Sequence, residues 1–323
     1  MLDLKANTKE FIFKQSHLLS LQDYTKEDIY KVLAKSLELK EEHAKNIPHP
    51  ILEGKTLAMI FTKSSTRTRV SFEVGIKQLG GYGLFLNNND IQLGRGESIE
   101  DTAKVLSRYV DGIMIRTYDQ VDVLNLAKYG SVPVINGLTD IYHPCQILAD
   151  LLTIYEVKGR FSGLKLAYIG DGNNVSNSLL IGCTKVGMDI SIGCPRGYEP
   201  CSDIVSVALE NSKTSYSKVK VTNSAIEAMK DADIVYTDVW ASMGQEAEEA
   251  IRERDFAPFQ VNSKLFSYAK DDAIFLHCLP AYRGREVTAE VIDGPQSYIF
   301  DEAENRLHVQ KAIMALLMGE GGS

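Results

Sequence analysis

The sequence predicts an α/β protein of two domains, each a parallel β-sheet flanked by helices, joined by interdomain helices. From about residue 54 onward, short apolar runs of strand character alternate with longer amphipathic segments, the pattern of parallel sheets with helices on both faces. The 323 residues exceed the usual size of one hydrophobic core, which favours two domains of about 150 residues each. No run approaches the ~18 apolar residues of a membrane span, so we expect a soluble protein.

The first elements are a helix and a series of strands. Residues 24–45 form a long amphipathic pattern, and Thr25 with Asp28 resembles a capping box at its start. The strands that follow are expected at 55–61, 82–86, 112–116, 132–136, 165–170, 188–193, 218–222, 233–239, 273–279 and 297–300.

Helical patterns lie between and after these strands. One covers residues 98–110, and another covers 67–81. The apolar residues of the latter fall mostly on one side of the helix: Val70, Val74, Ile76 and Leu79. Residues 143–159 are expected to form one helix that joins the fourth strand to the fifth, and 301–319 form the last helix.

The domain boundary is placed near residue 150, because turn residues after the helix at 143–159 restart the strand pattern. The first domain is expected to span residues 1–148 and the second 149–302. The C-terminal helix, 303–319, is expected to pack back on the first domain.

Composition excludes several classes of function. The net charge is −8, from 35 basic and 43 acidic residues, which argues against a general nucleic-acid or anionic-membrane binder. The five cysteines contain no C-x-x-C pair, so reduced thiols are expected rather than disulfides or a structural zinc site. No metal and no cofactor are expected. The charged, polar start resembles neither a secretory signal nor a transit peptide, so the predicted location is the cytoplasm.

The segment SSTRTR, residues 64–69, combines hydroxyls and arginines at a predicted helix start. Helix N-termini present backbone N–H groups, and arginine forks match phosphate oxygens, so these residues predict an anion site for a small phosphate compound. The alternative is that Ser64 to Thr66 only cap the helix while Arg67 and Arg69 lie in water. A Walker A loop is absent.

Three motifs in this order resemble the carbamoyltransferase family: STRTR at 65–69, HPCQ at 143–146 and HCLP at 277–280. The resemblance covers essentially the whole chain. Within the family, DVWASMGQE from Asp238 looks like the S-M-G loop of the members that use ornithine, which the aspartate-using members lack. The resemblance implies transfer of the carbamoyl group of carbamoyl phosphate to the side-chain amine of L-ornithine, giving L-citrulline and phosphate.

The resemblance also implies roles for residues of the first domain. The phosphate would be held by Ser65, Thr66, Arg67, Thr68 and Arg116. The carbamoyl group would be bound by a set comprising Arg116, Thr68, His143, Gln146, Gln92 and Arg306, together with Pro144 and Cys145 of HPCQ. Cys145 is interpreted as a small core residue rather than a nucleophile. The loop around Gln92 is equally consistent with a plain surface loop.

In the second domain, the resemblance implies that Asn174, Ser242 and Met243 bind the amino-acid end of ornithine. Asp238 would orient the attacking amine, and Cys278 would lie beside it. The backbone carbonyls of Cys278 and Leu279 would contact the carbamoyl NH₂. The catalytic residues would thus be Arg116, His143, Asp238 and Cys278.

Other hypotheses fit less well. IGDGNN, from Ile169, follows a strand, but the third glycine of a dinucleotide fingerprint would fall at Val175. A carbamoyltransferase for putrescine or N-acetylornithine and a non-catalytic phosphate-binding paralogue are the alternatives. The resemblance further implies a homotrimer with active sites near subunit contacts.

Overall fold

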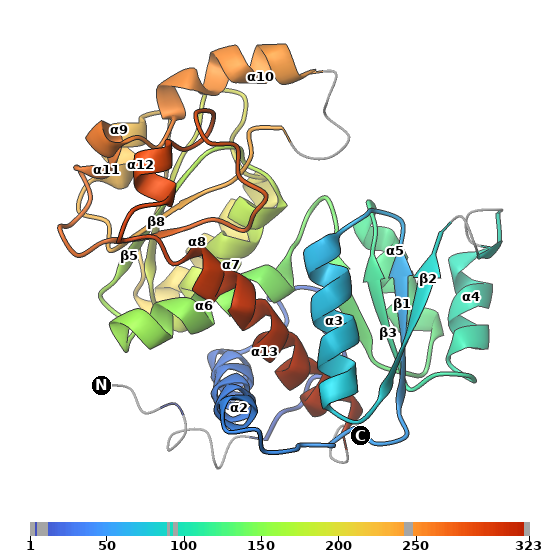
Figure 1. The fold of residues 1–323 in the computed structure, drawn as a ribbon. Helices are drawn as coiled ribbons and strands as arrows, with labels where there is room; N and C mark the ends of the chain where they lie inside the picture. Colours follow the sequence, from blue (N-terminus) through green and yellow to red (C-terminus); the bar gives the residue numbers. More distant parts are fainter. Residues whose placement is uncertain (1–3, 5–11, 89–90, 93–95, 242–247, 320–323) are drawn as a thin grey trace. The chain divides into compact units, whose positions relative to one another are not determined.

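The computed structural model describes residues 4, 12–88, 91–92, 96–241 and 248–319. The chain divides into two compact units (Figure 1). The first unit comprises Leu2–Leu152 and Glu304–Ser323, and the second comprises Thr153–Ala303. The division falls within α6 (Pro144–Lys158) and within α13 (Ile299–Met318), so the two units are joined by helices.

The first unit contains a four-stranded parallel sheet in the order β2-β1-β3-β4. Its strands are β1 (Thr56–Phe61), β2 (Tyr82–Asn87), β3 (Gly112–Arg116) and β4 (Val134–Leu138). Its helices, besides its parts of α6 and α13, are α2 (Lys26–Ala44), α3 (Thr66–Gln78), α4 (Ile99–Leu106) and α5 (Gln120–Tyr129). The predicted capping box is confirmed, because Thr25 Oγ1 accepts from the Asp28 N–H while the Asp28 carboxylate accepts from the Thr25 N–H.

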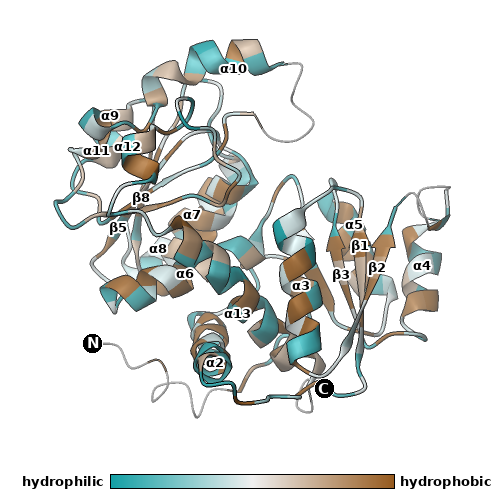
Figure 2. Ribbon diagram, in the orientation of Figure 1, coloured by the Kyte–Doolittle hydropathy of each residue, from teal (hydrophilic) through white to brown (hydrophobic). Residues whose placement is uncertain are grey.

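Helices cover both faces of this sheet. On one face, Ala58 and Ile60 of β1 pack in a cluster with Ala103 of α4 and Leu126 of α5. Strands β1 and β3 carry the hydrophobic colour of Figure 2, in keeping with the burial of β3 throughout and of β1 after its first residue. On the other face lies α3, whose Ile76 is fully buried.

Helix α3 also packs against α13 of the same unit. A Cβ on Gly75 would lie 3.0 Å from Met314 Cε, so the absence of a side chain permits this approach. The predicted apolar side of α3 was partly wrong. Ile76 and Leu79 are fully buried, whereas Val70 and Val74 are 52% and 36% exposed.

The second unit contains a five-stranded parallel sheet in the order β7-β6-β5-β8-β9. Its strands are β5 (Lys165–Ile169), β6 (Asp189–Gly193), β7 (Val219–Thr222), β8 (Ile234–Thr237) and β9 (Ile274–Leu276). Its helices are α7 (Asn174–Val186), α8 (Ser202–Ser215), α9 (Ala225–Met229), α10 (Glu249–Phe256), η3 (Ala257–Phe259), α11 (Ser263–Phe266) and α12 (Ala289–Ile292). Residues of β5, β8 and β9 form one core cluster with α9, α11 and α12.

The strand predicted at 297–300 is wrong. Ser297 makes only an isolated bridge with Phe275, and α13 begins at Ile299. Ile299 is 2% exposed and Phe300 is 71% exposed, so the apolar run divides between the inner and outer sides of a helix. The acidic residues in the first turn of α13 favour a helix start there, because they complement the helix dipole.

The order of the strands predicts where ligands bind. In an open parallel sheet, ligands collect at the carboxyl ends of the strands where the strand order reverses. In the first unit that point lies between β1 and β3, which end at Phe61 and Arg116. In the second unit it lies between β5 and β8, which end at Ile169 and Thr237. Among the described helices, none has the length and apolar character that a membrane crossing requires.

Candidate active site

The loop after β1 leads into the N-terminus of α3, where hydroxyl and guanidinium groups follow one another in sequence. Ser65 is the N-cap residue, and its Oγ accepts a hydrogen bond from the Thr68 N–H at 3.2 Å. The Ser65 hydroxyl also donates to Thr68 Oγ1 at 3.1 Å. Thr66 begins the helix, Arg67 is half-buried, and no acidic residue lies in the first turn. The positive end of the helix dipole is therefore available to an anion.

Helix α13 brings a buried arginine to the same place. The Arg306 Nη2 donates to Thr68 Oγ1 at 3.2 Å, and its Nη1 donates to Gln146 Oε1 at 2.7 Å. The Gln146 Nε2 donates to Asp150 Oδ1 at 2.8 Å, which fixes the orientation of the amide. Fully 160 positions separate Gln146 and Arg306 in the sequence. The fold therefore joins Thr68, Gln146 and Arg306, as the family resemblance implied.

A neutral histidine lies among arginines in this cluster. Arg116 ends β3, His143 immediately precedes α6, and both side chains are buried. Burial, and then the positive charges of Arg306, Arg116 and Arg67, lower the pKa of His143 well below its ordinary value. The imidazole is therefore neutral at physiological pH and can donate its single N–H. The first unit thus holds a positive cluster that contains one neutral donor.

The other predicted residues of the first unit differ in their surroundings. Pro144 begins α6, and Cys145 is fully buried. The Cys145 thiol donates to the Asn136 carbonyl at 3.4 Å, and burial raises the pKa of this thiol to about 12. Such a thiol is not a nucleophile at neutral pH. Gln92 is exposed, its carbonyl accepts from the Glu97 N–H at 3.1 Å, and its contact with a substrate stays a prediction.

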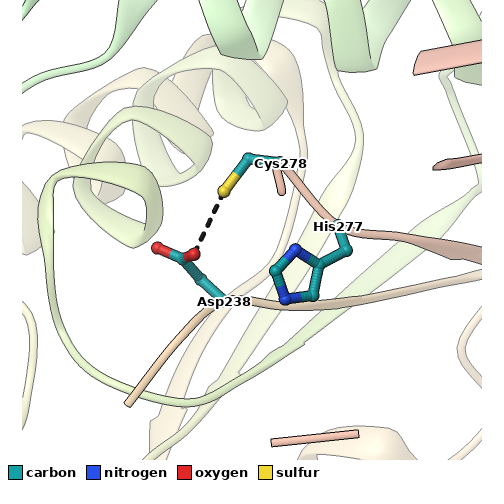
Figure 3. Close-up of side chains that lie close together, drawn as sticks. All are labelled: Asp238, His277 and Cys278. Atoms are coloured by element: carbon teal, nitrogen blue, oxygen red, sulfur yellow. Dashed lines mark hydrogen bonds between the residues drawn. The ribbon is translucent and has the colours of Figure 1, made fainter. Parts of the chain in front are cut away.

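The second unit holds a different cluster, at the carboxyl ends of β8 and β9 (Figure 3). Asp238 directly follows β8 and is buried. Its Oδ2 accepts a hydrogen bond from Asn173 Nδ2 at 2.8 Å, and its Oδ1 accepts from the Cys278 thiol at 3.1 Å. Because the thiol donates a hydrogen bond to a carboxylate, Cys278 keeps its proton in this arrangement and is not a thiolate.

His277 lies between β9 and Cys278 and has both ring nitrogens engaged. The Leu279 N–H donates to His277 Nδ1 at 2.9 Å, and His277 Nε2 lies 3.2 Å from Glu286 Oε1. One ligand-type atom from each of Asp238, His277 and Cys278 lies within 4.8 Å of the others. Neither imidazole nitrogen has a lone pair left for a cation in this arrangement. The three residues therefore fit a hydrogen-bonded site better than a metal site.

The two asparagines after β5 have different positions. Asn174 was predicted to bind the amino-acid end of ornithine, and the structure shows in addition that the side chain of its neighbour Asn173 contacts Asp238. Asn173 is also the N-cap of α7, and Asn174 is the first residue of that helix. A role for Asn174 in binding stays a prediction. Ser242 and Met243 lie outside the described residues.

The sequence analysis missed a buried arginine on α10. The Arg252 Nη1 donates to Asp171 Oδ2 at 2.8 Å and to the Trp240 carbonyl at 2.9 Å. Its Nε donates to Glu248 Oε2 at 2.9 Å. Arg252 thus ties α10 to the turn after β5. The charged segment IRERD resembles a solvated helix face, so the sequence carried no signal for this contact.

The glycine pair after β5 serves chain packing. A Cβ on Gly172 would lie 2.3 Å from the Glu199 carbonyl carbon and 2.4 Å from the Pro200 nitrogen. The Gly172 N–H donates to the Tyr198 carbonyl at 2.8 Å. In the dinucleotide fingerprint the second glycine lets a pyrophosphate approach the backbone. Here the chain's own backbone takes that place, which argues against a dinucleotide.

Comparisons with known proteins agree with this geometry. Residues 16–156 match the family "Aspartate/ornithine carbamoyltransferase, carbamoyl-P binding domain", and residues 162–317 match "Aspartate/ornithine carbamoyltransferase, Asp/Orn binding domain". The ornithine carbamoyltransferase of Thermococcus kodakarensis is 59% identical over 302 residues, which cover 94% of this chain and 96% of that relative. The ornithine carbamoyltransferase of Bacillus subtilis is 60% identical over 306 residues, 95% of each chain.

Solved structures show the same fold. The ornithine carbamoyltransferase from Pyrococcus furiosus has a TM-score of 0.93 at 55% identity, covering 95% of this chain and 98% of its own. The anabolic ornithine carbamoyltransferase from Campylobacter jejuni has a TM-score of 0.88 at 43% identity, covering 94% of this chain and 99% of its own.

Proposed function

The chain belongs to the aspartate/ornithine carbamoyltransferase family, and from that premise we propose that it is an ornithine carbamoyltransferase. It transfers the carbamoyl group of carbamoyl phosphate to the side-chain amine of L-ornithine, giving L-citrulline and phosphate. The observation that carries the proposal is the group of three arginines around the neutral His143, at the carboxyl ends of β1 and β3. One relative is named as anabolic, and we place the reaction in arginine biosynthesis.

The phosphate of carbamoyl phosphate binds at the N-terminus of α3. Ser65, Thr66 and Thr68 supply hydroxyl and backbone donors, and Arg67 and Arg116 supply charge. The supporting facts are the N-cap geometry of Ser65 and the absence of acid in the first turn. A dianion in this position gains charge-assisted hydrogen bonds and the favourable end of the helix dipole.

The attacked carbonyl develops negative charge on its oxygen, which His143, Arg116 and Thr68 stabilise. A neutral imidazole can donate one N–H without adding a second positive charge, and the lowered pKa of His143 keeps it in that form. Gln146 holds the carbamoyl nitrogen, and Arg306 fixes Gln146 through its 2.7 Å hydrogen bond. Donors held in this way need no reorganisation as the charge develops.

The amine of ornithine must arrive unprotonated, although a free amine of this type has a pKa near ~10.4. Asp238 accepts a hydrogen bond from the amine and orients it beside Cys278. In the transfer, the bond from the amine nitrogen to the carbonyl carbon forms, and the carbon–oxygen bond to phosphate breaks. The electron pair leaves with phosphate, and the proton that the amine releases goes to the phosphate leaving group, which departs as hydrogen phosphate. No acyl-enzyme is needed, so positioning and electrostatics supply the rate.

The remaining site assignments belong to the same proposal. Asn174, Ser242 and Met243 bind the amino-acid end of ornithine, and the carbonyls of Cys278 and Leu279 contact the carbamoyl NH₂. Gln92 adds a contact to carbamoyl phosphate. The match of residues 162–317 to a domain described as binding aspartate or ornithine supports this placement of the acceptor.

The assembly is a homotrimer, which a surface of the first unit supports. Val70 and Val74 of α3 are exposed, and so are Tyr82 and Leu84 of the edge strand β2. Exposed apolar groups on neighbouring elements favour a protein contact. Light scattering on the purified protein should give three times the monomer mass, and a monomer would contradict the assignment. A cytoplasmic location accords with the five cysteines, all of them free.

The test of the activity is to offer carbamoyl phosphate with ornithine, putrescine, N-acetylornithine or aspartate and to follow both the ureido product and released phosphate. Strong preference for ornithine is expected. Preference for another amine would overturn the acceptor assignment and leave the phosphate site standing. Absence of turnover with every amine would favour the non-catalytic paralogue.

A further inference from the structure

The turn after β9 has an unusual backbone conformation. Leu279 has a φ of 56°, in the left-handed region that residues other than glycine, asparagine and aspartate rarely adopt. Such a conformation persists only when surrounding contacts hold it, and it is found at functional sites more often than elsewhere. Leu279 directly follows Cys278, whose thiol donates to Asp238. The contacts that hold Leu279 therefore bear on the geometry of the proposed acceptor site.

The direct support for this turn is an imidazole. The Leu279 N–H donates to His277 Nδ1 at 2.9 Å. An accepting Nδ1 carries a lone pair, so the single proton of the neutral ring is on Nε2. That nitrogen lies 3.2 Å from Glu286 Oε1, to which it can donate. Glu286 Oε1 also accepts from the Tyr282 N–H at 2.6 Å, which fixes the carboxylate itself.

A second carboxylate fixes the backbone of the same histidine. Glu302 Oε2 accepts from the His277 N–H at 2.8 Å, and Glu302 Oε1 accepts from the Tyr236 hydroxyl at 3.1 Å. His277, Glu286 and Glu302 are each 1% exposed. Burying two carboxylates is costly unless they accept hydrogen bonds. Both of them contact His277, and the ring of His277 contacts the turn.

We propose that Glu286 and His277 are positioning residues for carbamoyl transfer. Glu286 holds the imidazole in its Nε2–H tautomer, and the free Nδ1 lone pair then holds the Leu279 N–H. The carbonyls of Cys278 and Leu279 are thereby fixed for the carbamoyl NH₂. This inference rests on the proposed function for its kinetic meaning, whereas the tautomer itself does not depend on any activity.

Two amide substitutions of His277 distinguish the roles of its two ring nitrogens. In His277→Asn, the side-chain oxygen lies where Nδ1 was and can still accept from Leu279. In His277→Gln, the amide reaches toward Glu286, as Nε2 does, but no acceptor remains at the Nδ1 position. We expect His277→Asn to keep kcat within about tenfold of the wild type and His277→Gln to lose about 100-fold. The KM for carbamoyl phosphate should change less than kcat in both, because the proposed phosphate contacts of the first unit are untouched.

A matched pair of substitutions at Glu286 tests the hydrogen bond on the other side of the His277 ring. Glu286→Gln keeps an oxygen that accepts from both N–H groups, so kcat should stay within about threefold. Glu286→Leu removes the acceptor, and kcat should fall by about tenfold or more. A role in folding alone would lower the melting temperature in either pair and leave the kcat of the folded enzyme unchanged. That result, or a larger loss in His277→Asn than in His277→Gln, would overturn the inference.

A spectroscopic measurement keeps the test independent of activity. In protein labelled with ¹⁵N-histidine, the His277 signal is assigned by its loss in His277→Asn. We expect the shifts of a neutral Nε2–H ring, which change in Glu286→Leu. An Nδ1–H ring or an imidazolium in the wild type would refute the inference. Wild-type turnover with ornithine is measured separately. If the proposed function is wrong, turnover will be absent, but the ¹⁵N shifts that report the tautomer of His277 will not change.

Discussion

In the first unit, three arginines surround a neutral histidine and a helix N-terminus, whereas in the second a buried aspartate accepts hydrogen bonds from an amide and a thiol. Both clusters lie where the strand order of a parallel sheet reverses. The topology therefore sets the place of each cluster, and the residues after each strand set its charge. A positive cluster suits a phosphate dianion, and an acidic one suits an amine.

The histidines His143 and His277 in these two clusters show the same contrast. His143 has arginines around it, and burial together with their charges lowers its pKa. His277 has Glu286 at its ring and Glu302 at its backbone N–H. The first can act as a donor to an oxyanion, and the second is held in place as an acceptor. Residue type alone does not set the role, because the neighbours decide which nitrogen carries a proton.

The largest expected effect comes from removing one charge of the positive cluster. Arg67→Ala should lower kcat/KM for carbamoyl phosphate by about 1000-fold, because a charged donor to the reacting group is lost. Arg67 is only half-buried, so the melting temperature should change little. The control is Arg69→Ala, because Arg69 is exposed. Its Nε lies 3.5 Å from Glu73 Oε2, and its Cζ lies 3.7 Å from the centroid of the Phe85 ring. Near-normal kinetics in Arg67→Ala would contradict the assignment of Arg67 to the phosphate of carbamoyl phosphate.

A smaller effect is expected from neutralising the acidic cluster. Asp238→Asn should lower kcat with ornithine by about 100-fold, because the amine loses its charged acceptor. The rise in melting temperature caused by inorganic phosphate should be the same as in the wild type, and it should be absent in Arg67→Ala. Asp203→Asn, an exposed position in the same unit, serves as control. If Asp238→Asn also abolished the phosphate effect, the division of labour between the clusters would be wrong.

The smallest expected effect is a difference between the two units in how acid affects their stability. Burial lowers the pKa of His17, His49, His143 and His308, all in the first unit, and that of His308 falls to about 3. As the pH falls below ~6.5, the unfolded chain takes up protons that the folded His308 refuses until about pH 3. Over that window this histidine costs at most about 1.4 kcal/mol of unfolding free energy for each pH unit.

The measurement is urea unfolding of the wild type and of His308→Gln between pH 4 and pH 7.5. The unfolding free energy of the variant should decline less steeply toward acid, because one group with a lowered pKa is gone. Parallel declines in the two proteins would show that His308 takes up its proton equally in both states.

Most of the fold could be predicted from the sequence because inner strands such as β3 and β8 are buried on both faces and read as continuous apolar runs. The same signal misled at residues 297–300, where Ile299 and Phe300 begin a helix with one residue inside and one outside. The exposed Val70 and Val74 also escaped prediction. Apolar spacing indicates a helix, but it does not tell a core contact from a surface that another chain can cover.

The candidate site could be predicted only as far as local chemistry reached. Hydroxyls and arginines at a helix start predicted an anion site, and the N-cap bond of Ser65 fits both that site and the alternative of a helix cap alone. Two consecutive asparagines look alike in sequence, and only the N-cap geometry shows that Asn173 reaches Asp238. Glu286 and Arg252 act through tertiary contacts that no spacing reveals. Long-range pairs of this kind were predicted from the family resemblance or were not predicted.

The hydrogen bonds of Arg306 to Gln146 and Thr68 also bear on how the protein is made. A chain leaves the ribosome from its N-terminus, and domains fold in that order. Thr68 and Gln146 emerge long before the last helix, which carries Arg306. The proposed site for carbamoyl phosphate would therefore lack Arg306 until synthesis is almost finished. A nascent or prematurely ended chain should capture little of this reactive metabolite.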